Sequence, residues 1–165
     1  MTAEPAEPSL DPKLLARAGH GAVQIDLPTR KPLKVMLAGP IKVWWEPGQW
    51  DTTLHQAYVR WRDAVRVVCV RAGFLVYSPH RAWQGAWHED AQRVNDEAIR
   101  MSDVMIDLSP PDIPRAGTDA EATLAESVGT AVLSAPPGDA AAMRRLLDEL
   151  HRHDERTHNS VEPAS

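Results

Sequence analysis

Short apolar runs alternate along the chain with longer segments of helical periodicity, and this alternation constrains the fold more than any other feature. Four runs of strand length are largely apolar: residues 33–38, 74–77, 104–108 and 130–134. The segment after the first run repeats apolar residues every three or four positions: Leu54, Tyr58, Trp61, Val65 and Val68. Strands that alternate with helices at this spacing predict an α/β fold with a doubly wound parallel sheet of four to five strands.

The chain is predicted to form one domain between two polar segments. Its 165 residues suit a single core of ordinary size. Residues 1–31 are interpreted as a flexible arm, residues 32–152 as the domain, and residues 153–165 as a disordered tail. Gly129 is expected to end one helix, and Asp139 to cap the next.

A further helix is predicted over residues 88–101. Its apolar face is expected to carry four residues: Ala91, Val94, Ala98 and Met101. Two polar residues, Asn95 and Asp96, lie near its middle.

The candidate site follows the apolar run at residues 104–108. A Pro-rich loop comes next, and Gly117 and Thr118 then open an Ala-rich helical segment. Ligands of open α/β sheets lie outside the carboxyl ends of the strands, so this loop belongs to the expected site. Glu121 is expected in the first helical turn, where the helix dipole stabilises an anion. The spacing Thr-x-x-Glu also matches a capping box between Thr118 and Glu121, and on spacing alone that explanation is the more common one.

Tryptophan is concentrated in two loops that follow predicted strands. The chain has six Trp, and five of them lie in these loops: Trp44, Trp45, Trp50, Trp83 and Trp87. Aromatic walls for a planar ligand are one interpretation. Coverage of an oligomer interface is the other, because aromatic residues are enriched there too.

Charge and composition argue against several classes of partner and compartment. The net charge is −5 and no run of Lys or Arg forms a stripe, so no polynucleotide partner is expected. No apolar stretch has the length of a membrane span, and the first residues lack the pattern of a signal peptide, so no membrane partner is expected. Cys69 is the only cysteine, which suits a cytoplasmic location and predicts a buried, inert thiol.

The motifs of several enzyme classes are absent from the sequence. It contains no phosphate-binding loop of the ATPase type, no dinucleotide fingerprint and no serine-hydrolase elbow. His80, His88 and Asp90 match no zinc spacing, and neither a metal nor a cofactor is expected. A carboxylate near a helix start, with aromatic loops around it, suits attack on an anomeric carbon while a planar base leaves.

Four short motifs occur in a fixed order, and together they resemble a known family. They are Ala38-Gly39-Pro40, Tyr77-Ser78-Pro79-His80-Arg81, Ile99-x-x-x-Asp103 and Gly117-Thr118-x-x-Glu121-x-x-x-Ala125. Over residues 33–135 the pattern resembles the nucleoside 2-deoxyribosyltransferase superfamily, and within it most resembles the cytidine-monophosphate N-glycosidases. The resemblance implies a flavodoxin-like sheet, a homo-oligomer in which a neighbour helps close the site, and cleavage of a base from C1′ of a nucleoside or its 5′-monophosphate.

The resemblance also implies roles for single residues. Glu121 becomes the nucleophile, which reverses the preference for a capping role. Asn95 stands where the family has an Asp that assists protonation of the leaving base, and an amide has no titrating proton to give. Either the adjacent Asp96 substitutes, or Asn95 only orients the base, or the activity is altered. Thr123 replaces a small Gly of the family and is expected to narrow the sugar pocket.

The expected substrate-binding residues come from the same motifs and from the two loops. They are Gly39, Pro40, Lys42, Trp44, His80, Arg81, Trp87, Gly117 and Thr118. Lys42 stands where related nucleotide hydrolases carry Arg. The predicted function is therefore a hydrolase or a transferase that acts on a nucleoside or nucleotide. The alternatives are a nucleotide-binding module that has lost turnover, and a structural subunit that uses its Trp loops for partner contacts.

Overall fold

The computed structural model of the protein describes residues 31–40, 52–79 and 90–159. The chain divides into two units between Lys31 and Pro32, and every element below belongs to the second unit. Lys42, Trp44, His80, Arg81 and Trp87, which the sequence assigns to substrate binding, lie outside the described residues, as do the other loop tryptophans.

Four parallel strands form one sheet in the order β2-β1-β3-β4. Their bounds are β1 (Lys34–Ala38), β2 (Leu75–Tyr77), β3 (Val104–Asp107) and β4 (Ala131–Ser134). Each lies within one residue of the run predicted from the sequence. The α/β fold with a doubly wound, flavodoxin-like parallel sheet is therefore confirmed.

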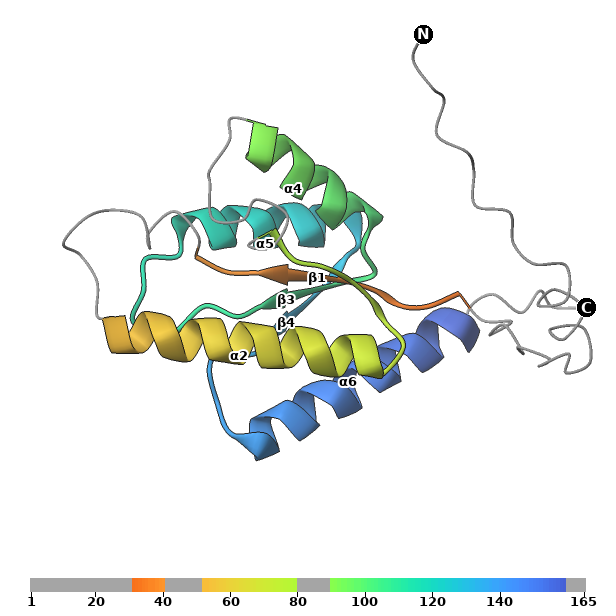
Figure 1. The fold of residues 1–165 in the computed structure, drawn as a ribbon. Coiled ribbons are helices and arrows are strands. Elements are labelled where there is room, and N and C mark those ends of the chain that lie inside the picture. Colours follow the sequence, from red (N-terminus) through yellow and green to blue (C-terminus); the bar gives the residue numbers. More distant parts are fainter. Residues whose placement is uncertain (1–30, 41–51, 80–89, 160–165) are drawn as a thin grey trace, which may run out of the picture. The chain divides into compact units, whose positions relative to one another are not determined.

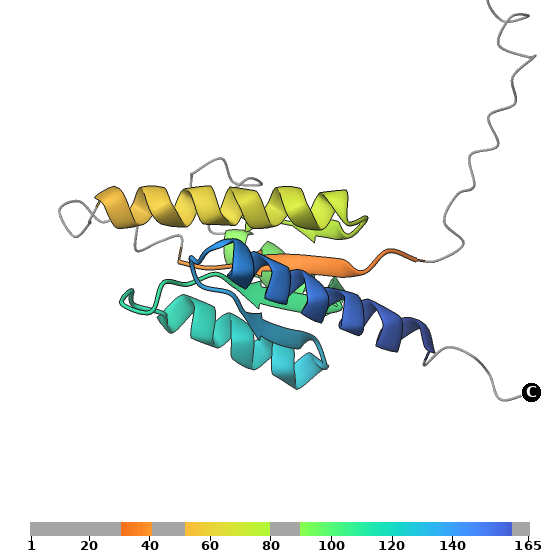
Figure 2. The ribbon, with the colours of Figure 1, turned by 90° about the horizontal axis from the view of Figure 1, so that it is seen from below.

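Helices cover both faces of the sheet (Figure 1). Their bounds are α2 (Thr52–Arg71), α4 (Asp90–Met101), α5 (Ala116–Val128) and α6 (Ala140–Asn159). Figure 1 shows α4 and α5 over one face and α2 and α6 over the other. In Figure 2, seen from below, α6 passes in front of the strands. Gly129 ends α5 with a φ of 81°, as predicted for a helix stop.

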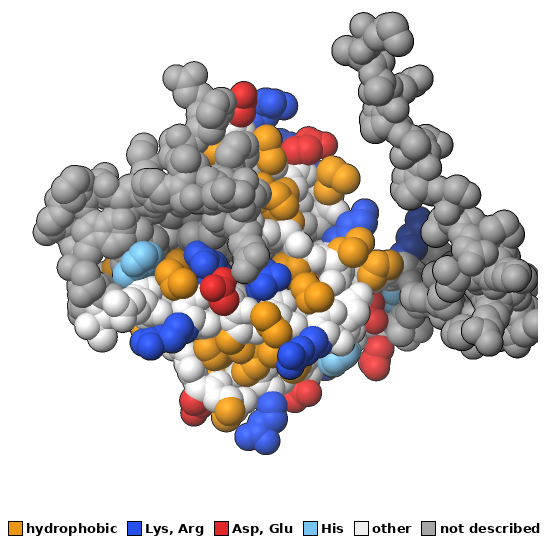
Figure 3. All heavy atoms as spheres, in the orientation of Figure 1, with side chains coloured by type: hydrophobic (Ala, Val, Ile, Leu, Met, Phe, Trp, Pro, Cys, Tyr) orange, Lys and Arg blue, Asp and Glu red, His pale blue; other side chains and the backbone are white. Residues whose placement is uncertain are grey.

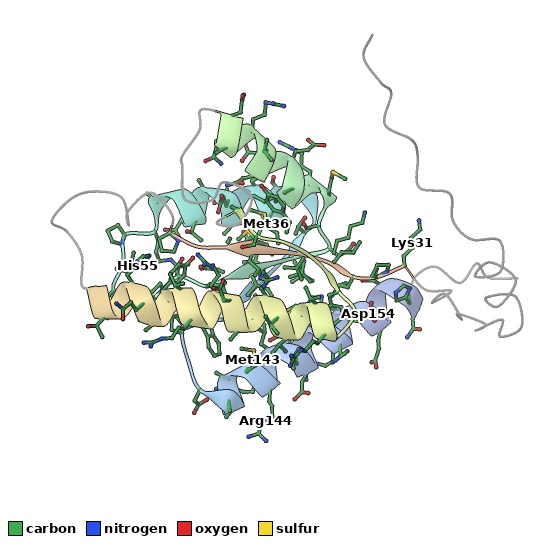
Figure 4. The ribbon with its side chains drawn as sticks, in the orientation of Figure 1. Lys31, Met36, His55, Met143, Arg144 and Asp154 are labelled. Carbon is green, nitrogen blue, oxygen red and sulfur yellow. The ribbon has the colours of Figure 1, made fainter. Side chains whose placement is uncertain are left out.

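The core has two layers because successive strand residues point to opposite faces. Val35 and Leu37 of β1 pack with the buried residues of α2 and α6. Met36 and Ala38 pack with Ile99 of α4 on the other face, and Figure 4 marks Met36 beside the α5 side of the sheet. These β1 residues are at most 1% exposed, so the strand is buried on both sides.

Two core predictions from α2 are also confirmed. Trp61 is buried, and its indole Nε1 donates to the carbonyl of Ala135 at 2.8 Å. Cys69 is 1% exposed, and burial raises the pKa of its thiol to about 11. A thiol of that pKa is protonated and inert at neutral pH.

The buried face of α4 differs from the predicted one. Ala91 is buried as expected, but the other buried residues are Asn95 and Ile99. Met101, which was expected on the apolar face, is 59% exposed. Periodicity favoured apolar Met101 over polar Asn95, whereas the helix turns Asn95 inward because both ends of the amide have hydrogen-bond partners there, Tyr77 and Glu121.

The last helix is longer than the sequence predicts. Asp139 Oδ1 accepts from the Ala142 amide at 2.9 Å, which confirms the predicted cap. However, α6 continues through Asn159, so the prediction of a disordered tail is wrong for residues 153–159. Contacts four residues apart, such as His158 Nε2 to Asp154 Oδ1 at 3.3 Å, support this polar end of the helix without burying it.

The exposed side chains of the described residues are mixed in character. Figure 3 shows hydrophobic side chains interspersed with Arg over α2 and α6. Among the described helices, none has the length and hydrophobicity that crossing a membrane would require.

Gly39 follows β1 and is one of the residues that the sequence assigns to substrate binding. The space over its Cα is instead taken by Tyr58 of α2: a Cβ built on Gly39 would overlap the Tyr58 hydroxyl and lie 3.1 Å from the ring Cζ. Tyr58 is fully buried, so its ring has little room to move. Glycine at position 39 is therefore needed for packing in the fold itself.

Replacing Gly39 by Ala is expected to lower the free energy of unfolding by about 1–3 kcal/mol, the usual cost of overpacking. Combining it with Tyr58→Phe, which removes the overlapping hydroxyl, should recover part of that loss in a double-mutant cycle. Urea unfolding measures both values. Gly117→Ala is the matched control, because nothing lies within 4 Å of a Cβ at that position. An equally small effect at both glycines would contradict this interpretation of Gly39.

Candidate active site

The candidate site lies at the carboxyl ends of β1 and β3. These neighbouring strands end together, with Ala38 paired to Asp107. Strand order reverses here, because the chain leaves β1 for β2 on one side and later returns to form β3 on the other. Open α/β sheets bind ligands outside such a reversal point.

Two buried carboxylates lie near this edge, Asp107 at the end of β3 and Glu121, which is the candidate nucleophile. Glu121 lies on α5 and is 9% exposed. Asn95 Nδ2, on α4, donates to Glu121 Oε1 at 3.3 Å. The Tyr77 hydroxyl, at the end of β2, donates in turn to Asn95 Oδ1 at 3.2 Å. Three elements that are distant in sequence therefore meet through one chain of side-chain hydrogen bonds.

The expected position of Glu121 in the first helical turn is wrong. Helix α5 begins at Ala116, with Arg115 as its N-cap and Asp119 as the acidic residue of the first turn. Thr118 is therefore the third helical residue and Glu121 lies in the second turn. The earlier start follows Pro114, which the Thr-x-x-Glu spacing does not take into account.

The capping-box explanation is also wrong. No side chain caps α5 at its N-terminus. Thr118 is buried, and its Oγ1 accepts a hydrogen bond from Ser109 Oγ at 3.4 Å. The Glu121 carboxylate binds Asn95, on another helix. Thus both residues of the supposed box have tertiary partners.

Burial controls the ionisation of Glu121. It raises the pKa of this carboxyl from 4.5 to about 7, and the negative charges of Asp96 and Asp107 act in the same direction. The hydrogen bond from Asn95 favours the anion and opposes this rise. Near neutral pH, Glu121 therefore exchanges between a carboxylate and a neutral acid.

The negative charge of Asp107 is compensated by residues that the sequence analysis did not single out. Its Oδ1 accepts from the Ser109 amide at 2.9 Å, and its Oδ2 pairs with the Arg115 guanidinium. Arg115 also donates from Nε to Asp119 Oδ1 at 3.2 Å. The cation nearest in sequence to Glu121 is thus engaged by two other carboxylates.

The structure brings some predicted site residues together and separates others. Gly39 and Pro40 are buried at the end of β1. Gly117 is exposed in the first turn of α5, with open space where a side chain would project. Asp96 Oδ1 accepts from Gln92 Nε2 at 2.8 Å, and its negative charge acts on the nearby Glu121. Thr123 is exposed and donates to the Asp119 carbonyl at 2.9 Å, so its hydroxyl is directed to its own helix.

Within the described ranges, no three His, Cys, Asp or Glu side chains are grouped so that they could hold a metal ion.

No protein-family model matches the sequence, and no curated protein matches it. The chemistry of the site must therefore be argued from its own residues. A buried carboxyl with a pKa near neutrality can act as a nucleophile when ionised or as a proton donor when neutral.

The raised pKa of Glu121 makes a prediction for stability. The folded state binds the Glu121 proton more tightly than the unfolded chain does. The ionised carboxyl therefore lowers the free energy of unfolding as the pH rises above 4.5, and the full loss is reached above about 7. Glu121→Gln, which keeps the acceptor for Asn95, should therefore stabilise the protein at pH 8 by up to about 3 kcal/mol. The gain should disappear near pH 4.5.

Urea unfolding at several pH values from 4.5 to 8 measures this difference. Glu126→Gln, an exposed change on the same helix, is the control and should leave the pH dependence as it is. A Glu121→Gln protein that follows the wild-type curve at every pH would show that the carboxyl has an ordinary pKa.

Proposed function

We propose that the protein cleaves the N-glycosidic bond of a nucleoside or nucleoside 5′-monophosphate, with Glu121 as the nucleophile. The observation that supports this most is the buried carboxylate at the carboxyl edge of the sheet, held by an amide from a neighbouring helix. The order of the short motifs that resemble nucleoside 2-deoxyribosyltransferases supports the same substrate class.

In the proposed reaction Glu121 attacks C1′ of the sugar. Asn95 Nδ2 holds Oε1, so the other carboxylate oxygen forms the new bond. The bond from C1′ to the base nitrogen breaks, and the base leaves with the electron pair and takes up a proton. An ester between the sugar and Glu121 remains. A water molecule or a second base then attacks C1′ and releases the carboxylate.

Asn95 has a different role here from the Asp of the resembling family. An amide neither gives nor takes a proton at neutral pH, so Asn95 cannot protonate the leaving base. Its contact with Glu121 supports a role in orienting the nucleophile. The nearby Asp96 carboxyl can donate the proton that the base takes up only in its protonated form, and only if it exchanges its bond with Gln92 for one to the base.

Hydrolase and transferase differ only in the acceptor. In a hydrolase, water attacks the sugar ester; in a transferase, a second base does. The described residues support both equally, and a homo-oligomer that completes the site stays a prediction. A second candidate function, a nucleotide-binding module without turnover, is favoured by one observation: Asn95 replaces a titrating acid.

The decisive experiment is incubation with matched pairs of nucleosides and their 5′-monophosphates, with chromatography for free base. Release is expected from at least one pair. Glu121→Gln should reduce the rate at least about a thousand-fold, because it removes the nucleophile while keeping the shape of the side chain. Glu126→Gln should retain the wild-type rate. Saturable nucleotide binding without any base release would instead support the binding module.

The pH dependence of the reaction identifies the active form of Glu121. A nucleophile must be ionised, so kcat/KM should rise about tenfold per pH unit below the pKa of about 7 and level off above it. Initial rates of base release from pH 5 to 9 measure this profile. A rate that falls as the pH rises through 7 would mean that Glu121 acts as a proton donor.

A further inference from the structure

The Asn95 side chain has a hydrogen-bond partner at each end. Its Oδ1 accepts from the Tyr77 hydroxyl at 3.2 Å, and its Nδ2 donates to Glu121 Oε1 at 3.3 Å. Asn95 is 1% exposed, so neither end can exchange its partner for bulk water. The amide thus connects the end of β2 with the carboxylate on α5.

The orientation of this amide matters for Glu121. An amide presents a donor at one end and an acceptor at the other, and the two ends have nearly the same shape. Facing Glu121 with Nδ2, it stabilises the ionised carboxylate. Facing it with Oδ1, it would repel the carboxylate and bind only the neutral acid. The Tyr77 hydroxyl donates to Oδ1 and so favours the first orientation.

We propose that Tyr77 is a positioning residue: through its hydroxyl it fixes the Asn95 amide so that Nδ2 faces Glu121 and the carboxylate is ready to attack. The relevance to catalysis rests on the proposed function of Glu121. The effect on the ionisation of Glu121 does not, and it can be measured without turnover.

The other groups around Glu121 make this contribution important. Asp96 from α4 and Asp107 from β3 both disfavour its ionised form. Tyr58 from α2 is a neutral neighbour, because burial raises the pKa of its hydroxyl. Arg115 is engaged by Asp107 and Asp119. The hydrogen bond from Asn95 opposes the effect of these two carboxylates on the ionisation of Glu121. Tyr77 keeps the Asn95 amide in the orientation that makes this bond.

The test is the titration of Glu121 followed by carbon NMR of labelled side-chain carboxyls, with the signal assigned by its loss in Glu121→Gln. Tyr77→Phe removes the hydroxyl and keeps the ring. It should raise the pKa of Glu121 by about 0.5 to 1, the equivalent of one hydrogen bond. At pH 6 the rate of base release should fall about three- to tenfold, and at pH 9 it should approach the wild-type rate.

A second background separates positioning from a direct effect. In Asn95→Leu, or in Asn95→Ala if leucine does not fit, the amide is gone and adding Tyr77→Phe should leave the titration where it is. The inference is overturned if Tyr77→Phe does not move the titration in the wild-type background, or moves it equally without Asn95. A moved titration in a protein that releases no base would keep the positioning role and refute the proposed function.

Discussion

The chemistry at the carboxyl edge of the sheet depends on how one buried carboxylate is compensated. Removing a charge from water is costly unless partners replace the lost solvation. Glu121 receives a hydrogen bond from the Asn95 amide, while Arg115, the basic residue nearest to it in sequence, pairs with Asp107 and Asp119. Partial compensation leaves the pKa of Glu121 near 7. Such a group is costly for a purely structural role and well suited to a reactive one.

The fold explains why this carboxylate is where it is. A parallel sheet brings the ends of all its strands to one edge, and the reversal of strand order between β1 and β3 opens that edge to ligands. Helix α5 follows β3 and brings Glu121 into contact with Asn95 of α4. At the same edge, the Tyr58 side chain occupies the space where a side chain at position 39 would project. Core packing around Gly39 and the candidate site therefore lie at the same edge of the sheet.

The strands could be predicted from the sequence to within one residue, because apolar runs between breaks are strong local signals. The beginning of α5 could not, since Thr118 and Glu121 imitate a capping box that tertiary contacts override. The contact of Tyr77 with Asn95 joins residues 18 positions apart, and no local pattern reports it. Periodicity likewise placed Met101 on the apolar face of α4, whereas Asn95 is the buried residue. Sequence reasoning thus singled out Glu121 and Asn95 as candidates but did not find the hydrogen bonds that connect them to each other and to Tyr77.

Detection of the covalent intermediate tests the central claim most directly. A nucleoside with fluorine at C2′ destabilises an oxocarbenium-like transition state, so the sugar ester on the enzyme should persist long enough for mass spectrometry after denaturation. The proposed nucleophile predicts one pentosyl group on the peptide that contains Glu121, formed together with release of the base. Release of the base with the adduct on another residue, or with no adduct in a single turnover, would contradict the assignment of Glu121.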